Sequence, residues 1–110
     1  LSKAFKILPP AAYFDMLTLE ANSKAIITDS GGIQKEAFFL KVPCITLRET
    51  TEWIETVTTG YNCIVGTDRN RIKKAIESIG KTTRLKDNCY GTGNAGLKIA
   101  RTLQRVFLKK

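Results

Sequence analysis

The segment Asp29-Ser30-Gly31-Gly32-Ile33-Gln34-Lys35-Glu36 combines residue types that bind phosphate groups. Its adjacent glycines let a ligand approach the backbone, and the hydroxyl of Ser30 adds a hydrogen-bond donor. A helix that begins here would contribute unpaired N–H groups and the positive end of its dipole. The segment follows the apolar run Lys24 to Thr28, so we expect it at the carboxyl end of a strand, where open α/β sheets bind ligands.

Glu36 lies about one helical turn after the glycines. A carboxylate there can accept two hydrogen bonds side by side, which suits the diol of a ribose. Phosphate at the turn and ribose at the carboxylate describe a nucleotide site, although the G-x-G-x-x-G fingerprint of dinucleotide binders is absent from the sequence. The same residues are equally compatible with a plain strand-to-helix turn that leaves Glu36 on the surface.

Two further residues are candidates for contacts with a nucleotide. Arg48 follows the apolar run Pro43 to Leu47, so it should emerge on the same side as the glycine turn. There it could contact a second phosphate, or form an ordinary ion pair with Glu49 or Glu52. Met16 could pack against a flat base, although filling the core is the more common role of methionine.

Several kinds of chemistry are excluded because the chain has no histidine. It cannot by itself build a Ser-His-Asp or Cys-His hydrolase or a His-ligated zinc site. The three cysteines, Cys44, Cys63 and Cys89, form no C-x-x-C pair. We interpret them as reduced thiols of a cytoplasmic protein, with Cys44 and Cys63 in the core. No apolar run approaches the ~18 residues that span a bilayer, so we expect no membrane partner.

The net charge of +8 is concentrated at the C-terminus. Residues 1–80 carry ten Lys and Arg against nine Asp and Glu, whereas residues 81–110 carry eight against one. A basic tail can bind nucleic acid, but no aromatic residues are interleaved with these cations as base stacking would require. Residues 94–108 show a 3.6-residue apolar repeat, which predicts an amphipathic helix that packs on a neighbouring domain or chain.

Apolar runs, glycines and capping residues predict alternating strands and helices along the chain. This order is typical of an α/β fold with a Rossmann-like parallel sheet and helices on both faces. About four strands make a partial sheet, so we expect residues 1–93 to be part of a domain and 94–110 to form the terminal helix. The predicted strands are Phe5–Leu8, Lys24–Thr28, Pro43–Leu47 and Asn62–Val65, and the predicted helices are Ala11–Asn22, Ile33–Leu40, Glu52–Thr59, Arg69–Ile79 and Asn94–Leu108, with a loop over 81–93.

Four blocks in order resemble the non-hydrolysing UDP-N-acetylglucosamine 2-epimerases over nearly the whole chain. The family pattern D-S-G-G-[IV]-Q-E-E-A resembles residues 29–37, and P-x-[LIV]-x-[LM]-R-x-x-T-E resembles residues 43–52. A V-G-T-[DN] turn is matched at residues 65–68, and N-P-Y-G-D-G-x-A is similar to residues 88–95.

The resemblance implies the C-terminal half of a GT-B-type enzyme, in which two Rossmann-like halves flank a cleft. Ser30, Gly31 and Gly32 would hold the diphosphate of UDP, and Glu36 the uridine ribose. The implied reaction inverts C2 of the sugar by eliminating and re-adding UDP, with neither metal nor redox cofactor. Family members take their acid and base residues from the N-terminal half and the linker, so we expect no catalytic residue here and an inactive isolated chain. A homodimer is also implied.

The chain departs from the family pattern at several positions. Lys35 replaces the first paired glutamate, Met16 aligns with a uracil-packing aromatic residue, and Trp53 stands where many members have a nucleotide-contacting arginine. The string Thr51-Glu52-Trp53-x-Glu55 resembles the branch that includes epimerases for UDP-2,3-diacetamido-glucuronate. Two other hypotheses are a GT-B glycosyltransferase and a non-catalytic module that binds nucleic acid or a partner chain.

Overall fold

The computed structural model describes residues 4–81 and 89–108, and these residues form five helices and three short strands. The elements in chain order are α1 (Tyr13–Ala21), β1 (Ile26–Thr28), α2 (Gly31–Phe39), β2 (Cys44–Thr46), α3 (Ile54–Thr58), β3 (Asn62–Ile64), α4 (Arg69–Glu77) and α5 (Ala95–Phe107).

The three strands pair in parallel in the order β1-β2-β3. Ile26 lies opposite Cys44, and Cys44 lies opposite Asn62, so the chain advances by 18 residues between paired positions in both cases. Helices α2 and α3 make the two crossovers that a parallel sheet requires. The carboxyl ends of all three strands therefore lie along one edge of the sheet.

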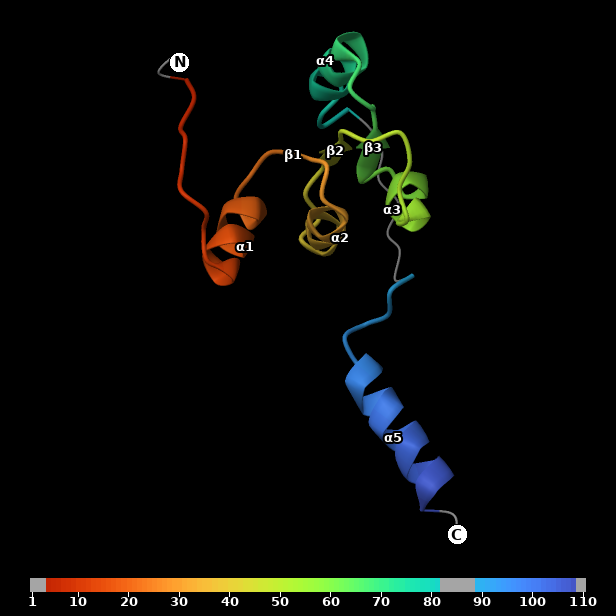
Figure 1. The fold of residues 1–110 in the computed structure, drawn as a ribbon. Helices are drawn as coiled ribbons and strands as arrows, with labels where there is room; N and C mark the ends of the chain where they lie inside the picture. The colour runs from red at the N-terminus through yellow and green to blue at the C-terminus, as the bar shows by residue number, and fades with distance from the viewer. Residues whose placement is uncertain (1–3, 82–88, 109–110) are drawn as a thin grey trace.

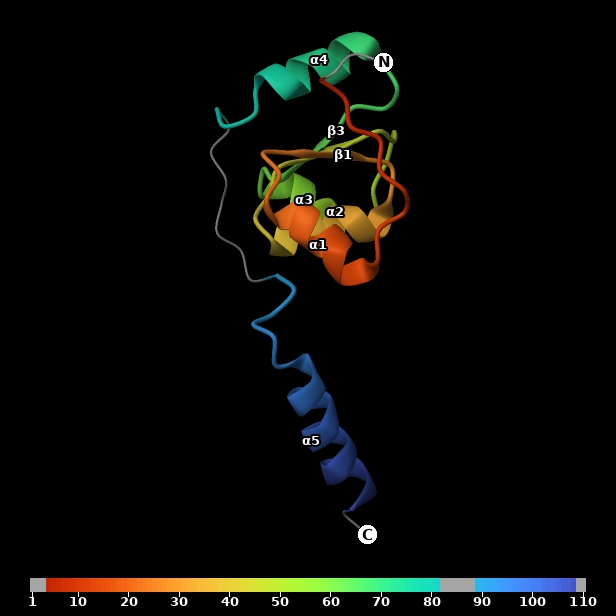
Figure 2. The same ribbon diagram turned by 90° about the vertical axis from the view of Figure 1, so that its left-hand side faces the viewer.

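The helices cover both faces of the sheet. Figure 2 shows α1, α2 and α3 on one face and α4 on the other. The central strand β2 is buried at all three positions, and its Ile45 is in the core with Val65 and Ala75 of α4. This arrangement confirms the predicted α/β sheet with helices on both faces.

The predicted strand Phe5–Leu8 is wrong. These residues are extended but pair with no strand, and the side chains of Phe5 and Ile7 are 71% and 76% exposed. A strand needs a neighbour to accept its backbone hydrogen bonds, and this segment lies to one side of the sheet and leads into α1 (Figure 1). The described residues therefore contain three of the four predicted strands.

Capping side chains set where two helices begin. Helix α2 starts at Gly31, two residues earlier than predicted, because the hydroxyl oxygen of Ser30 accepts the Ile33 N–H at 3.3 Å. The glycines thus lie in the first helical turn and not in a turn before it. Asp68 caps α4 as predicted, accepting the Arg71 N–H at 2.8 Å.

The two cysteines expected in the core differ in burial. Cys44 is 3% exposed on the central strand, as predicted, but Cys63 is exposed. Cys63 lies on the edge strand β3, where only one neighbouring strand shields it, so its apolar sequence neighbours did not indicate its burial. Neither Cys44 nor Cys63 forms a disulfide bond.

The C-terminal helix α5 extends away from the sheet and its other helices (Figure 1). None of its residues is buried, although its sequence is strongly amphipathic. The loop predicted over 81–93 falls partly outside the described residues. Among the helices that the structure describes, none is long and apolar enough to cross a membrane.

Candidate functional site

The start of α2 follows β1 directly, so it lies at the edge formed by the carboxyl ends of the strands. The first hydrogen bond of the helix runs from the Gln34 N–H to the Ser30 carbonyl at 3.1 Å. The amides of Gly31 and Gly32 precede this bond and have no carbonyl one turn earlier in the helix. The Ser30 hydroxyl accepts a bond from Ile33 and keeps its own proton to donate. This corner can therefore offer several donors to an anion.

The two glycines have different surroundings. A side chain at Gly31 would have to displace the carboxylate of Glu52, and the Trp53 indole nitrogen lies 3.5 Å from the position of its first carbon atom. At Gly32 the nearest atom to that position is the Ser30 hydroxyl oxygen at 3.8 Å. The backbone is thus covered by side chains at Gly31 and open at Gly32, so Gly32 is the position where a ligand can approach most closely.

Arg48 emerges at this edge, as predicted from its place after β2. Its guanidinium contacts the Glu52 carboxylate, with 3.1 Å between Nη1 and Oε2, so the ion-pair alternative is the one found. Both side chains are more than one-third exposed, and an exposed pair of this kind contributes little to stability. The guanidinium can therefore exchange Glu52 for another anion at low cost.

Glu36 is half-buried on α2, and it lies beside a buried carboxyl group of α1. That group belongs to Glu20, which is 2% exposed and whose two oxygens make no hydrogen bond of good geometry with the described residues. The pKa of Glu20 is raised to about 7, first by burial and then by the neighbouring Glu36. Glu20 is therefore protonated at slightly acidic pH.

Glu20 was not singled out from the sequence. A signal was available, because an acidic residue stands among Leu17, Leu19 and Ala21 on a helix that must bury one face. Glu20 also faces Cys44, whose thiol pKa is raised first by its own burial. The structure thus places an unassigned titratable group directly behind the predicted ribose-binding residue.

Buried polar side chains brace the corner from behind. Gln34 of α2 is fully buried and its carbonyl oxygen accepts the Thr51 hydroxyl at 2.6 Å and the Asn62 amide at 3.0 Å. Asn62 in turn accepts the Thr46 hydroxyl at 2.6 Å and donates to Thr56 at 3.1 Å. This network ties α2 to β2, β3 and α3, so the start of α2 is held rigidly against the sheet.

Tyr90, which follows α4 in the chain, also reaches the corner. The Lys35 ammonium lies 4.2 Å from the ring centre of Trp53 and 4.3 Å from that of Tyr90. The Tyr90 hydroxyl donates to Glu55 at 3.0 Å. The pKa of Glu55 is lowered, first by a backbone N–H and then by this hydroxyl and the Lys35 charge. Tyr90 therefore fastens the segment before α5 to α2 and α3.

Met16, the remaining predicted contact, is half-buried on α1. Helix α1 packs against α2, so Met16 belongs to the same face of the sheet as the corner. Among the described residues no group of three Cys, Asp or Glu side chains could hold a metal ion.

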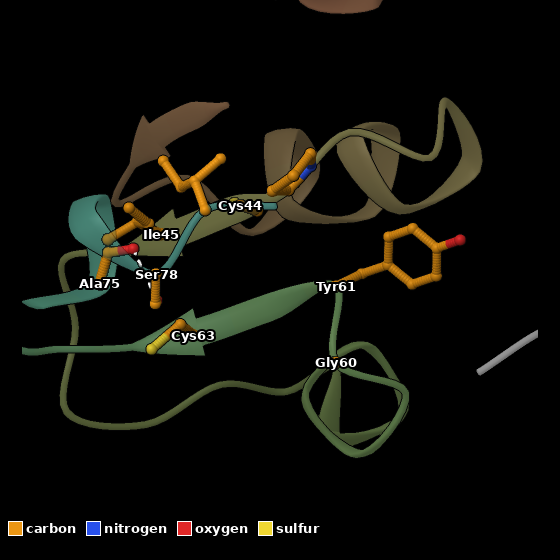
Figure 3. Close-up of a pocket in the computed structure, with 9 residues that line it drawn as sticks. Cys44, Ile45, Gly60, Tyr61, Cys63, Ala75 and Ser78 are labelled. Atoms are coloured by element: carbon orange, nitrogen blue, oxygen red, sulfur yellow. Dashed lines mark hydrogen bonds between the residues drawn. The ribbon is translucent and has the colours of Figure 1, made fainter. Parts of the chain in front are cut away.

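A small hollow lies elsewhere, between α4 and the strands β2 and β3 (Figure 3). Its volume of about 40 Å³ is far below the roughly 300 Å³ of a small-molecule pocket. None of the predicted site residues lines it, and the lining residues are Pro43, Cys44, Ile45, Gly60, Tyr61, Cys63, Ala75, Ser78 and Ile79. This hollow is therefore too small to hold a nucleotide.

Known proteins resemble this chain over nearly all its length. A relative in Methanococcus maripaludis, described as a UDP-N-acetylglucosamine 2-epimerase homolog, is 45% identical over 92% of this chain and 28% of its own length. The UDP-2,3-diacetamido-2,3-dideoxy-D-glucuronate 2-epimerase of Pseudomonas aeruginosa is 43% identical over 92% of this chain and 29% of its own length.

A solved structure shares the fold as well as the sequence. The UDP-GlcNAc 2-epimerase of Methanocaldococcus jannaschii, in complex with UDP-GlcNAc and UDP, superposes with a TM-score of 0.84 at 46% identity. The match covers 94% of this chain and 28% of that one, so this chain spans less than a third of the length of these relatives. The family model described as UDP-N-acetylglucosamine 2-epimerase matches residues 1–104. With both the sequence and the fold in agreement, the chain belongs to the UDP-N-acetylglucosamine 2-epimerase family.

Proposed function

We propose that this chain is the UDP-binding C-terminal portion of a UDP-N-acetylglucosamine 2-epimerase. The observation that carries the proposal is the start of α2, where Gly31 and Gly32 present backbone amides and Glu36 follows one turn later. The amides and the Ser30 hydroxyl bind the diphosphate, and the Glu36 carboxylate accepts the ribose diol. The family membership and the UDP complex of the Methanocaldococcus relative support this assignment.

Arg48 and Met16 complete the proposed site. Arg48 leaves its exposed pair with Glu52 for the diphosphate, to which its forked guanidinium is suited. Met16 packs against the uracil ring. Both assignments place cationic or apolar groups from neighbouring elements around the open face at Gly32.

The reaction proposed for the longer protein is the inversion of C2 of the sugar. UDP is eliminated across C1 and C2 with loss of the C2 proton, giving a 2-acetamidoglucal. UDP then adds back after C2 is reprotonated from the other face. This chain binds UDP and so holds the leaving group in place between the two steps. We propose that it is inactive alone, and turnover of UDP-GlcNAc by the 110 residues would contradict this.

A second candidate substrate is UDP-2,3-diacetamido-glucuronate. The Pseudomonas relative whose name specifies this sugar is 43% identical, and the Thr51-Glu52-Trp53 string resembles its branch. Both candidates share the UDP group, so they share the proposed contacts of this chain. Turnover measured with each sugar on the longer protein would distinguish them.

Helix α5 is proposed to pack on the remaining part of the longer protein. Its apolar side chains are exposed, and a 13-residue helix is only marginally stable in water without packing. The relatives are more than three times as long as this chain. The additional residues of a protein of that length would provide a surface that covers the apolar face of α5.

The test of the proposed site is Glu36→Gln, measured by calorimetric titration with UDP. Loss of the charged acceptor should weaken UDP binding by about 1–3 kcal/mol, roughly 5- to 150-fold. Glu77→Gln on the exposed α4 surface is the matched control and should leave affinity unchanged. Equal affinities for the Glu36 variant and the native chain would contradict the ribose role, and a native chain that binds no UDP would contradict the proposed function.

A further inference from the structure

The indole of Trp53 makes a direct hydrogen bond to the start of α2. Its Nε1–H donates to the carbonyl oxygen of Gly31 at 2.8 Å, across 22 residues of sequence. Trp53 is half-buried at the beginning of α3. A side chain from the loop after β2 therefore holds the backbone at the first residue of the candidate anion site.

This bond controls the direction of a donor. The Gly31 carbonyl and the Gly32 N–H belong to one planar, trans peptide unit, so they point in opposite directions. Whatever fixes the carbonyl also fixes the N–H. This peptide is the first of α2, and two consecutive glycines weaken a helical turn because they have no side chains that restrict the backbone. The Trp53 bond thus adds to the helical geometry in holding the Gly32 amide before any ligand arrives.

Further contacts hold the Trp53 side chain against α2. The Lys35 ammonium lies over the indole, 4.2 Å from the ring centre, and Tyr90 packs edge-on with ring centres 6.2 Å apart. Its backbone N–H donates to the Thr51 hydroxyl oxygen at 3.1 Å, and this hydroxyl donates to the fully buried Gln34. Lys35 and Gln34 both belong to α2, so the indole keeps its position relative to the glycines.

We propose that Trp53 is a positioning residue of the nucleotide site, whose indole N–H holds the Gly31–Gly32 peptide so that the Gly32 N–H faces the diphosphate. The inference rests on the proposed function, because it assumes that UDP binds at this corner. It assigns to Trp53 an action through the backbone and no contact with the nucleotide. Preorganised donors of this kind bind an anion without the cost of ordering them first.

The test removes the indole N–H and keeps the ring. Trp53 is replaced by 3-benzothienylalanine, in which sulfur takes the place of the N–H group, in the 110-residue chain. UDP and uridine binding are followed by NMR titration in the native and substituted chains. UDP binding should weaken about threefold to tenfold, the value of one hydrogen bond. Uridine binding should not change, because uridine carries no phosphate and is held by Glu36.

Each outcome separates this proposal from the proposed function. Unchanged UDP affinity, or an equal loss for UDP and uridine, would overturn the role of Trp53 and leave the UDP site standing. A native chain that binds neither ligand would overturn both. A further readout needs no ligand: ¹⁵N relaxation should show faster motion of the Gly32 amide in the substituted chain and in Trp53→Phe. Unaltered Gly32 relaxation in both would overturn the proposal.

Discussion

The terminal helix α5 differs from the sheet in the burial of its apolar side chains. All three residues of β2 are buried, and Ile45 is 2% exposed. Helix α5 buries none of its residues, and Ile99 on it is 59% exposed. Both segments carry apolar side chains in a pattern that predicts their burial. The difference teaches that an amphipathic pattern shows which face a helix needs to cover, but not that this chain covers it.

The strongest test of this comparison is the same substitution in both regions. Ile45→Ala should lower the free energy of unfolding by about 2–5 kcal/mol, because it opens a cavity in the core. Ile99→Ala should change it by less than about 0.5 kcal/mol, because the side chain is exposed. Urea unfolding followed by circular dichroism measures both values. A large loss for Ile99→Ala in this chain would show that α5 packs on the sheet.

The longer protein sharpens the same comparison. If α5 packs on the remaining part of that protein, Ile99→Ala there should destabilise it by an amount similar to that expected for a core position. A small effect in both chains would contradict the proposed packing of α5.

The second largest expected effect on stability comes from the buried carboxyl group of Glu20. Helix α5 has no buried residue and so no buried carboxyl group. Its pKa of about 7 exceeds the ordinary 4.5, so between these values the folded state binds more protons than the unfolded state. Stability should therefore fall as pH rises through this window, by about 3 kcal/mol at most. Urea unfolding at pH 5 and pH 8 measures the fall.

Glu20→Gln should abolish most of this pH dependence, because the amide is neutral throughout. Cys44 also faces Glu20, but its pKa is raised from 9.0, so its thiol stays protonated between pH 5 and pH 8 and adds no dependence there. Glu77→Gln, on the exposed surface of α4, should keep the full dependence. If the Glu20 variant loses stability with pH as the native chain does, the assignment to Glu20 is wrong.

The smallest effect compares the first residues of two helices. Asp68 caps α4 through its side chain, so Asp68→Ala should cost about 1 kcal/mol. Asn94 precedes α5 without a capping hydrogen bond, and Asn94→Ala should therefore have almost no effect. Thermal unfolding of both variants checks the difference. Equal losses would contradict the prediction that Asp68 stabilises its helix as a cap and Asn94 does not.

Sequence patterns predicted the elements because their signals are local. Apolar runs, glycines and caps such as Asp68 act within a few residues, and each strand and helix after residue 10 was found within two residues at most of its predicted start or end. Phe5–Leu8 failed because a strand exists only beside a partner, which no local signal specifies. The predicted burial of Cys63 was wrong for a related reason, since its exposure depends on the position of β3 at an edge of the sheet.

The candidate site was predictable where it follows from chain order. Ser30 and the glycines come directly after a strand, so their place at the carboxyl edge could be inferred. The hydrogen bond from Trp53 to Gly31 and the pairing of Glu20 with Glu36 join residues 16 or more positions apart. Such contacts depend on how the helices pack, and a single sequence does not show that.

The equal spacing of the paired strands has a consequence for how the chain reaches its fold. Each strand meets its partner after the same short length of chain, 18 residues, and strand order follows chain order. Contacts 18 residues apart close short loops, and closing a short loop costs less chain entropy than closing a long one. During synthesis on the ribosome, β1 can pair with β2 before β3 has been made, so the sheet can grow one strand at a time from its N-terminal side.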